Sequence, residues 1–332
     1  HDASSKPDSG RRSRMLRLIA RRLIFAVVTL WVVSMVVFSA IELLPGDACQ
    51  AFLGQMAQGK RLENCRAEHN LNAPAYARYS DWALGLASGD LGKSIKRSKP
   101  LEEIIGPRFR NTVILGLTAA LVGIPLAIVL GALAALYRDR RADLWISFIA
   151  IFCMTVPEFI TGTLLISFFS VWLGWLPGIV IMRADAPLLE VLSKIVLPVM
   201  TLTLVMVAHI MRMVRTSMID VLASDFVMMS QLKGVSRVRQ VVMHALPNAL
   251  LPTINLIALN IAWLMGGVLV VEVVFNYPGI GRLSVNAISD RDFPLVQAIA
   301  LLMASLYVAL NLIADLLALV LNPKLRTRGA GL

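Results

Sequence analysis

The residues best suited to a functional role lie in a polar, partly basic stretch, 218–252, that interrupts an apolar second half of the chain. A helical pattern over 219–233 is followed by Gly234, and a second helix is predicted to start near Ser236 and run toward Pro247. Glycine ends helices in the left-handed conformation without a Cβ penalty, and serine is a favoured N-cap. A helix–glycine–helix hairpin between two membrane segments suits the docking of a soluble partner.

Patterns for covalent chemistry are missing from the sequence. There is no Ser/His/Asp arrangement, no pair of helical zinc histidines and no cofactor fingerprint, and the three cysteines have neither CxxC nor zinc-ligand spacing. Residues 87–94, A-S-G-D-L-G-K-S, match a relaxed phosphate-binding loop. A working loop of that kind follows a strand, whereas a helical pattern precedes this one, so nucleotide binding is not expected here.

Two further sets of residues carry open alternatives. Glu158 lies next to Pro157 in an apolar segment, and intramembrane carboxylates are costly and usually face a cavity or a partner. It either lines a translocation pathway or subunit seam, or is a hydrogen-bonded structural group. Cys49 and Cys65 lie in one polar insert and form either a disulfide or two free thiols, while Cys153 is expected to be reduced and buried.

Composition places these residues in a membrane protein. Of 332 residues, 57% are hydrophobic and 16% charged, and the mean hydropathy is +0.72, whereas soluble proteins carry about 25% charged residues. The net charge of +11 could indicate nucleic acid or anionic lipid. The basic residues flank apolar segments, however, which favours the membrane.

Six apolar segments are long enough to cross a bilayer, which takes about 20 helical residues. They lie at 23–44, 112–136, 144–173, 195–211, 251–275 and 295–321. The expected organisation is a disordered tail (1–14), a first transmembrane helix (15–45), a polar insert (46–110), a five-helix core (111–322) whose loop spans 217–250, and a tail (323–332). The insert should contain helices at 48–56, 62–68 and 75–87, the last packing through Tyr79 and Trp82.

Basic residues predict the orientation. Six spans put both termini on one side, and that side, with the loops at 137–141 and 217–250, holds most of the Lys and Arg. Because short cytoplasmic loops are enriched in these residues, the termini and the 217–250 loop are expected in the cytoplasm and the insert outside.

The polar stretch resembles the EAA loop of ABC-importer permeases of the dipeptide/oligopeptide/nickel branch. The similarity lies in D-F-V-x-x-x-x-x-K-G and H-A-L-P-N-A-L-L-P, and the chain departs from the family at 228–232. Further matches are G-W-L-P at 174–177, V-E-V-V-F-N-Y-P-G-I-G-R-L at 271–283, R-D-F-P-L-V-Q at 291–297 and N-L-I-A-D-L at 311–316. The resemblance covers roughly residues 15–326.

The resemblance implies an all-α integral membrane protein with six transmembrane helices in the type I ABC importer permease (MetI-like) fold. It implies a non-catalytic subunit of a binding-protein-dependent peptide importer in the bacterial inner membrane. Its partners would be a homologous second permease, two ATP-binding subunits that hold ATP and Mg, and a periplasmic solute-binding protein. The implied ATPase-coupling residues are Asp225, Phe226, Lys233, Gly234, Val235, His244 and Asn248.

Three points stay open at this level. Asp225 either caps the short helix that follows or meets a basic group on the ATPase. A bulky change at Gly281, in the turn at 276–282, is expected to leave assembly with the ATPase intact. An ion-coupled secondary transporter is the alternative function, since broken helices and midplane charges suit one.

Overall fold

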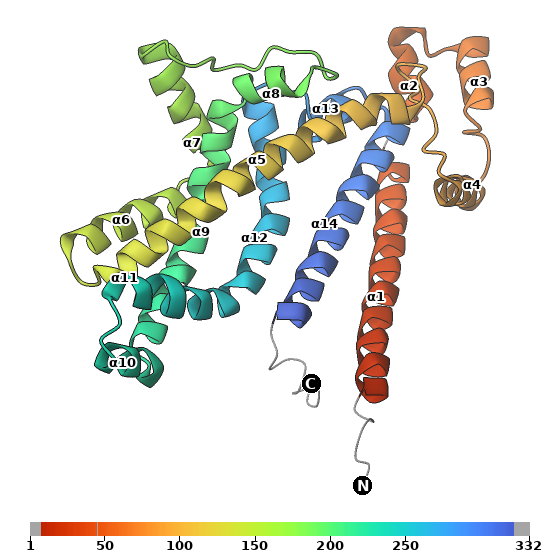
Figure 1. Cartoon of the computed structure of the whole chain (residues 1–332). Coiled ribbons are helices and arrows are strands. Elements are labelled where there is room, and N and C mark those ends of the chain that lie inside the picture. Colours follow the sequence, from red (N-terminus) through yellow and green to blue (C-terminus); the bar gives the residue numbers. More distant parts are fainter. Residues whose placement is uncertain (1–7, 45, 322–332) are drawn as a thin grey trace. The chain divides into compact units, whose positions relative to one another are not determined.

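The computed structural model describes residues 8–44 and 46–321, which form helices joined by turns (Figure 1). These residues contain no strand, only an isolated bridge between Lys93 and Pro100. The predicted all-α membrane architecture is confirmed. Five helices are long and apolar enough to cross a bilayer: Ile19–Glu42, Leu101–Leu136, Val196–Leu222, Leu256–Val274 and Phe293–Leu316.

The segment predicted as a single span at 144–173 is broken at Pro157. Helix α6 (Arg141–Thr155) ends there, and α7 (Glu158–Leu165), extended by a π-helix to Trp172, leaves at an angle of 109° to it. Proline lacks an amide hydrogen and forces the residue before it out of the helical region, and Val156 is accordingly extended, with ψ of 124°. A sixth span therefore exists only as this bent pair.

The chain divides into two compact units, each described by itself: His1–Glu102 with Ala287–Leu312, and Glu103–Asn286 with Ile313–Leu332. The helices of the first unit are α1 (Asp8–Glu42), α2 (Ala48–Leu53), a 3₁₀ turn (Gly54–Met56), α3 (Gly59–Glu68), α4 (Ala75–Ser88) and the first part of α14 (Phe293–Leu321). The three helices predicted inside the insert are thus present, with ends shifted by a few residues.

The polar insert folds onto the first transmembrane helix. Tyr79 and Trp82 of α4 contact Phe38 of α1, with ring centroids 5.3 and 6.2 Å away, and the Tyr79 hydroxyl is 2.8 Å from Ser34 Oγ. The spacing of Tyr79 and Trp82 had predicted that this helix packs, and α1 is the surface it uses.

Two further contacts hold the insert together. A disulfide joins Cys49 and Cys65, whose Cα atoms are 5.9 Å apart. Ser94, the last residue of the phosphate-loop-like sequence, donates its hydroxyl to the carboxylate of Asp292. That sequence begins in the last turn of α4 and turns at the left-handed Gly89, with no strand before it, and its Ser94 anchors the insert.

The second unit is built around one buried helix, α9 (Val196–Leu222). In its most apolar stretch 67% of the residues are buried, a larger share than in any other candidate span of the described residues. It packs against α6, α7 and α12 (Figure 1). The other elements of this unit are α5 (Leu101–Leu136), α8 (Leu188–Lys194), α10 (Asp225–Leu232), α11 (Arg237–Arg239), a π-helix (Gln240–Ala245), α12 (Leu246–Val274) and α13 (Ile280–Ser289).

Several helices are longer than predicted. Helix α1 starts at Asp8 rather than 15, α5 includes ten residues assigned to the insert, and α9 continues to Leu222 instead of ending at 211. The extension of α9 contains no glycine or proline, and its Arg215 finds a partner. It binds Asp143 of α6 through two hydrogen bonds of 2.6 Å. Residues 1–7, Pro45 and the predicted tail at 323–332 lie outside the described residues.

A fully buried carboxylate, Glu272 of α12, ties three elements of the second unit together. One of its oxygens accepts a hydrogen bond from the Thr112 hydroxyl of α5 at 2.6 Å, and the other accepts from the Gly281 amide at 2.6 Å. The Thr112 oxygen in turn accepts from the Ile280 amide at 2.9 Å. Buried charge is tolerated only when it is hydrogen-bonded in this way.

Gly281 is a closely packed position. A Cβ at 281 would lie 2.5 Å from the carbonyl oxygen of Leu269, and one at Gly279 would collide with the Glu272 carboxylate. The turn at 276–281 is packed directly on α12, so a bulky change there disturbs the fold and is no neutral control.

We predict that Gly281→Ala destabilises the protein by about 1–3 kcal/mol, as overpacking typically does. Gly266→Ala is the matched control, because a Cβ at 266 in α12 meets nothing within 4 Å. Thermal unfolding of the two purified variants measures the difference. Equal midpoints for both variants would contradict the close packing at Gly281.

Candidate functional site

The polar stretch forms a hairpin of two short helical pieces, and we call residues 225–248 the coupling hairpin. Helix α9 ends at Leu222 and α10 (Asp225–Leu232) follows, so the single helix predicted over 219–233 is two helices separated by Ser224. The Ser224 amide still bonds back to Val221, while its carbonyl starts α10 by accepting from Val227. Residues before 223 thus belong to the core helix.

Gly234 makes the turn that the sequence predicted. Its φ is +71°, its amide donates to the Gln231 carbonyl at 2.9 Å, and the Val235 amide donates to the Ser230 carbonyl at 3.3 Å. This pair of bonds is the Schellman arrangement, which requires a left-handed residue after the helix. A Cβ at 234 would meet nothing within 4 Å, so only the backbone conformation restricts this position.

The second arm of the hairpin continues into the membrane without a break. Helix α11 starts at Arg237 after Ser236, as predicted, but the helix does not stop at Pro247: a π-helix over Gln240–Ala245 leads straight into α12. Proline is accepted in the first turn of a helix, where its missing amide costs no bond. The buried Gln240 side chain donates to the Val235 carbonyl at 2.7 Å and holds the turn against this arm.

The tip of the hairpin is an exposed apolar surface. Leu232 and Val238 are 78% and 75% exposed. The other apolar residues of this surface are each more than half exposed: Phe226, Met228, Met229, Val242 and Met243. The basic side chains of Lys233, Arg237 and Arg239 border it. Methionine-rich apolar surfaces of this kind adapt to a partner's groove.

The structure brings some of the predicted coupling residues together. The Phe226 ring meets the edge of the His244 ring, with centroids 5.9 Å apart, and Asn248 donates to the His244 carbonyl at 2.7 Å. These contacts join α10 to the second arm. Asp225 and Lys233 are exposed at the two ends of α10, and Asp225 forms no side-chain hydrogen bond to a described residue. The N-cap position belongs to Ser224, which leaves the Asp225 carboxylate open to a partner.

The other predicted site residue, Glu158, lies at the break between α6 and α7. Pro157 occupies the N-cap position of α7, and Glu158 begins the helix. A Cβ at Gly267 of α12 would lie 2.5 Å from either Glu158 oxygen, so the carboxylate rests against bare backbone. Among the described residues, no group forms a hydrogen bond with this half-buried carboxylate.

His209 belongs to the same region. It lies on α9, acts electrostatically on Glu158, and stacks 5.3 Å from the Trp263 ring of α12. No sequence pattern predicts this grouping, because the three residues come from three separate helices. The role of Glu272 was also missed, although V-E-V-V-F-N-Y-P-G-I-G-R-L had been singled out.

Comparison with known proteins agrees with this architecture. Residues 127–327 match the family described as binding-protein-dependent transport system inner membrane component, and residues 15–116 match the N-terminal model of the same membrane component. The chain is similar to the glutathione transport system permease protein GsiC of Escherichia coli K12, with 35% identity over 94% of this chain and 99% of that protein. The same protein of Shigella dysenteriae serotype 1 is also 35% identical over those shares.

The family model covers more than half of the chain, and the apolar helices agree with it. The ion-coupled transporter considered from sequence is therefore set aside. The chain belongs to the family of binding-protein-dependent inner-membrane transport components, and it is a permease subunit of an ABC importer.

Proposed function

We propose that this permease moves small peptides, and that its coupling hairpin docks on an ATP-binding subunit. Similarity to glutathione permeases supports a peptide-like solute. The observation that carries the docking proposal is the exposed apolar tip, held on a Schellman turn between two membrane helices. The contacting residues would be Asp225, Phe226, Lys233, Gly234, Val235, His244 and Asn248.

The proposed assembly holds this chain, a homologous permease, two ATP-binding subunits and a solute-binding protein. ATP and Mg belong to the ATP-binding subunits, and this chain takes no part in hydrolysis. Closure of those subunits would draw the coupling hairpins together and open the helices toward the binding protein. Copurification tests the composition: isolation of a transport-competent chain without ATP-binding subunits would contradict it.

The hairpin prediction uses the left-handed backbone of Gly234. We expect Gly234→Val to abolish binding-protein-stimulated ATP hydrolysis and uptake, because a β-branched residue at positive φ costs about 1–3 kcal/mol and the turn shifts instead. A displacement of about 1 Å can weaken a geometry-dependent step a hundredfold. The measurement is ATPase and uptake by the reconstituted complex.

Two control variants separate coupling from folding. Gly174 also has a positive φ, +65°, and a Cβ there would meet nothing within 4 Å. Gly174→Val therefore introduces the same backbone strain in a loop away from the hairpin, and this variant should retain stimulated ATP hydrolysis. Gly234→Asn should also retain it, since asparagine tolerates the left-handed region. Normal transport by Gly234→Val would remove the hairpin from the coupling mechanism.

We further propose that Glu158, beside Pro157, lines the pathway and meets the ammonium group of a peptide. A carboxylate with no hydrogen-bond partner among the described residues suits a cationic group in transit. Glu158→Gln is expected to lower uptake of peptides with a free amino terminus by about tenfold, because the variant loses one charge-assisted hydrogen bond to the ammonium group. Uptake of N-acetylated peptides should change little.

Uptake into vesicles that hold the reconstituted complex and its binding protein tests this assignment and the peptide proposal together. Glu103→Gln, at an exposed position of α5, is the matched control. An equal effect of Glu158→Gln on free and acetylated peptides would make Glu158 a structural group. Failure of every peptide to enter with the unaltered complex would reject the peptide assignment itself.

The proposed orientation puts both termini and the coupling hairpin in the cytoplasm, and the insert with Cys49 and Cys65 outside. We expect a membrane-impermeant maleimide to label Cys65 in intact cells only after reduction, because the disulfide occupies both thiols. Cys49→Ser should allow labelling without reductant. If Cys65 is labelled only in permeabilised cells, the insert lies in the cytoplasm and the proposed orientation is wrong.

A further inference from the structure

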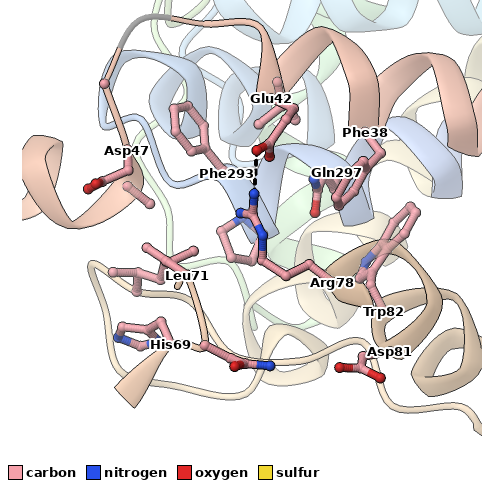
Figure 2. A pocket seen from close by; sticks show the side chains of 16 residues that line it. Phe38, Glu42, Asp47, His69, Leu71, Arg78, Asp81, Trp82, Phe293 and Gln297 are labelled. Carbon is pink, nitrogen blue, oxygen red and sulfur yellow. Dashed lines mark hydrogen bonds and ion pairs between the residues drawn. The ribbon is translucent and has the colours of Figure 1, made fainter. Parts of the chain in front are cut away.

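A pocket of about 390 Å³ lies within the first unit, between the end of α1, the loop before α4, α4 itself and the start of α14 (Figure 2). The pocket lining is partly apolar and partly charged. Phe38, Ile41 and Phe293 supply apolar surface, and Glu42, Arg78 and Asp81 supply charge. Neither the coupling hairpin nor Glu158 contributes to it.

The position of the pocket follows from the two spans that border it. Glu42 is the last residue of the span Ile19–Glu42, and Phe293 is the first residue of the span Phe293–Leu316. The lining therefore lies where two membrane helices meet the aqueous layer, at the level of lipid headgroups. Phe38, Tyr79 and Trp82 cluster at this level, as aromatic residues do at membrane interfaces. In the most apolar stretch of α1, only 6% of the residues are buried by the rest of the chain, so lipid can reach the site.

Most charges around the pocket are already paired. Arg78, in the middle of the view in Figure 2, binds Glu42, and Asp47 binds Arg66 at 2.7 Å. Asp81 lines the pocket, is exposed and has no basic partner among the described residues. Asp81 is therefore the carboxylate that the pocket offers to a ligand.

The next residue of α4, Trp82, also lines the pocket and carries an unused hydrogen-bond donor. The Trp82 indole Nε1–H is buried and has no acceptor in the described part of the chain. A buried donor without a partner is unfavourable, so an acceptor from outside the chain would stabilise the site. The pocket thus combines a free carboxylate, a free N–H donor and an apolar wall.

We propose that this pocket binds the headgroup of an ethanolamine phospholipid from the leaflet that borders the insert. The ammonium group would pair with Asp81, a phosphate oxygen would accept from Trp82 Nε1–H, and the upper acyl chain would lie against Phe38, Ile41 and Phe293. A choline headgroup has no N–H to donate to Asp81, and an anionic glycerol headgroup would be repelled by it. The bound lipid would anchor the insert at the membrane surface.

Native mass spectrometry of the purified complex, delipidated and titrated with phosphatidylethanolamine, tests this proposal. The unaltered complex should bind it in preference to phosphatidylglycerol. Asp81→Asn and Trp82→Phe should each weaken binding about tenfold, since each removes one hydrogen bond, charge-assisted in the case of Asp81. Glu63→Gln on α3 and Trp145→Phe on α6 are the matched controls, because both side chains are exposed and outside the pocket.

Three results would overturn the assignment: equal binding of the two lipids, equal binding by both pocket variants and the controls, or displacement of the lipid by a short peptide. The last result would make the pocket a solute site. If Trp82→Phe does not fold, Asp81→Asn decides the question, because an exposed aspartate contributes little to packing. Uptake is not used as the readout, so failure of this proposal leaves the proposed transport function standing.

Discussion

The buried carboxylate of Glu272 is the constraint on which the second unit depends. A charge inside a membrane helix is stable only if every oxygen finds a donor, and here Thr112 and the Gly281 amide supply them. The turn that carries the Gly281 amide can lie this close to α12 because Gly279 and Gly281 carry no side chain. One ionisable group therefore determines the residues at the turn, the register of α5 against α12 and the start of α13.

The same rule explains the contrast between the two glutamates of this unit. Glu272 is fully buried and fully bonded, whereas Glu158 lies at a helix break without a hydrogen-bond partner among the described residues. Pro157 produces that break because it cannot continue the backbone ladder of α6. A satisfied carboxylate stabilises the fold, and an unsatisfied one is available to a ligand.

The coupling hairpin is continuous with two of the helices around this second glutamate. Its first arm continues from α9, which carries His209, and its second arm continues into α12, which carries Trp263 and Gly267. These two helices pack on each other and on α7, the helix that starts with Glu158. A force applied at the hairpin would therefore reach the helices around Glu158 through continuous backbone. The Schellman turn at Gly234 and the Gln240 bond to Val235 give the hairpin a defined shape.

The sequence by itself determined the membrane class, the family, the helices of the insert and the glycine turn at 234. Those properties depend on composition, on local periodicity and on the backbone preference of single residues. Tertiary structure alone decided that Pro157 breaks its span sharply, that α9 extends to Leu222 and that Gly281 is packed on α12. It also decided the partners of Glu272 and Asp143 and the surroundings of Glu158. These depend on contacts between residues far apart in the chain, which helical periodicity does not encode.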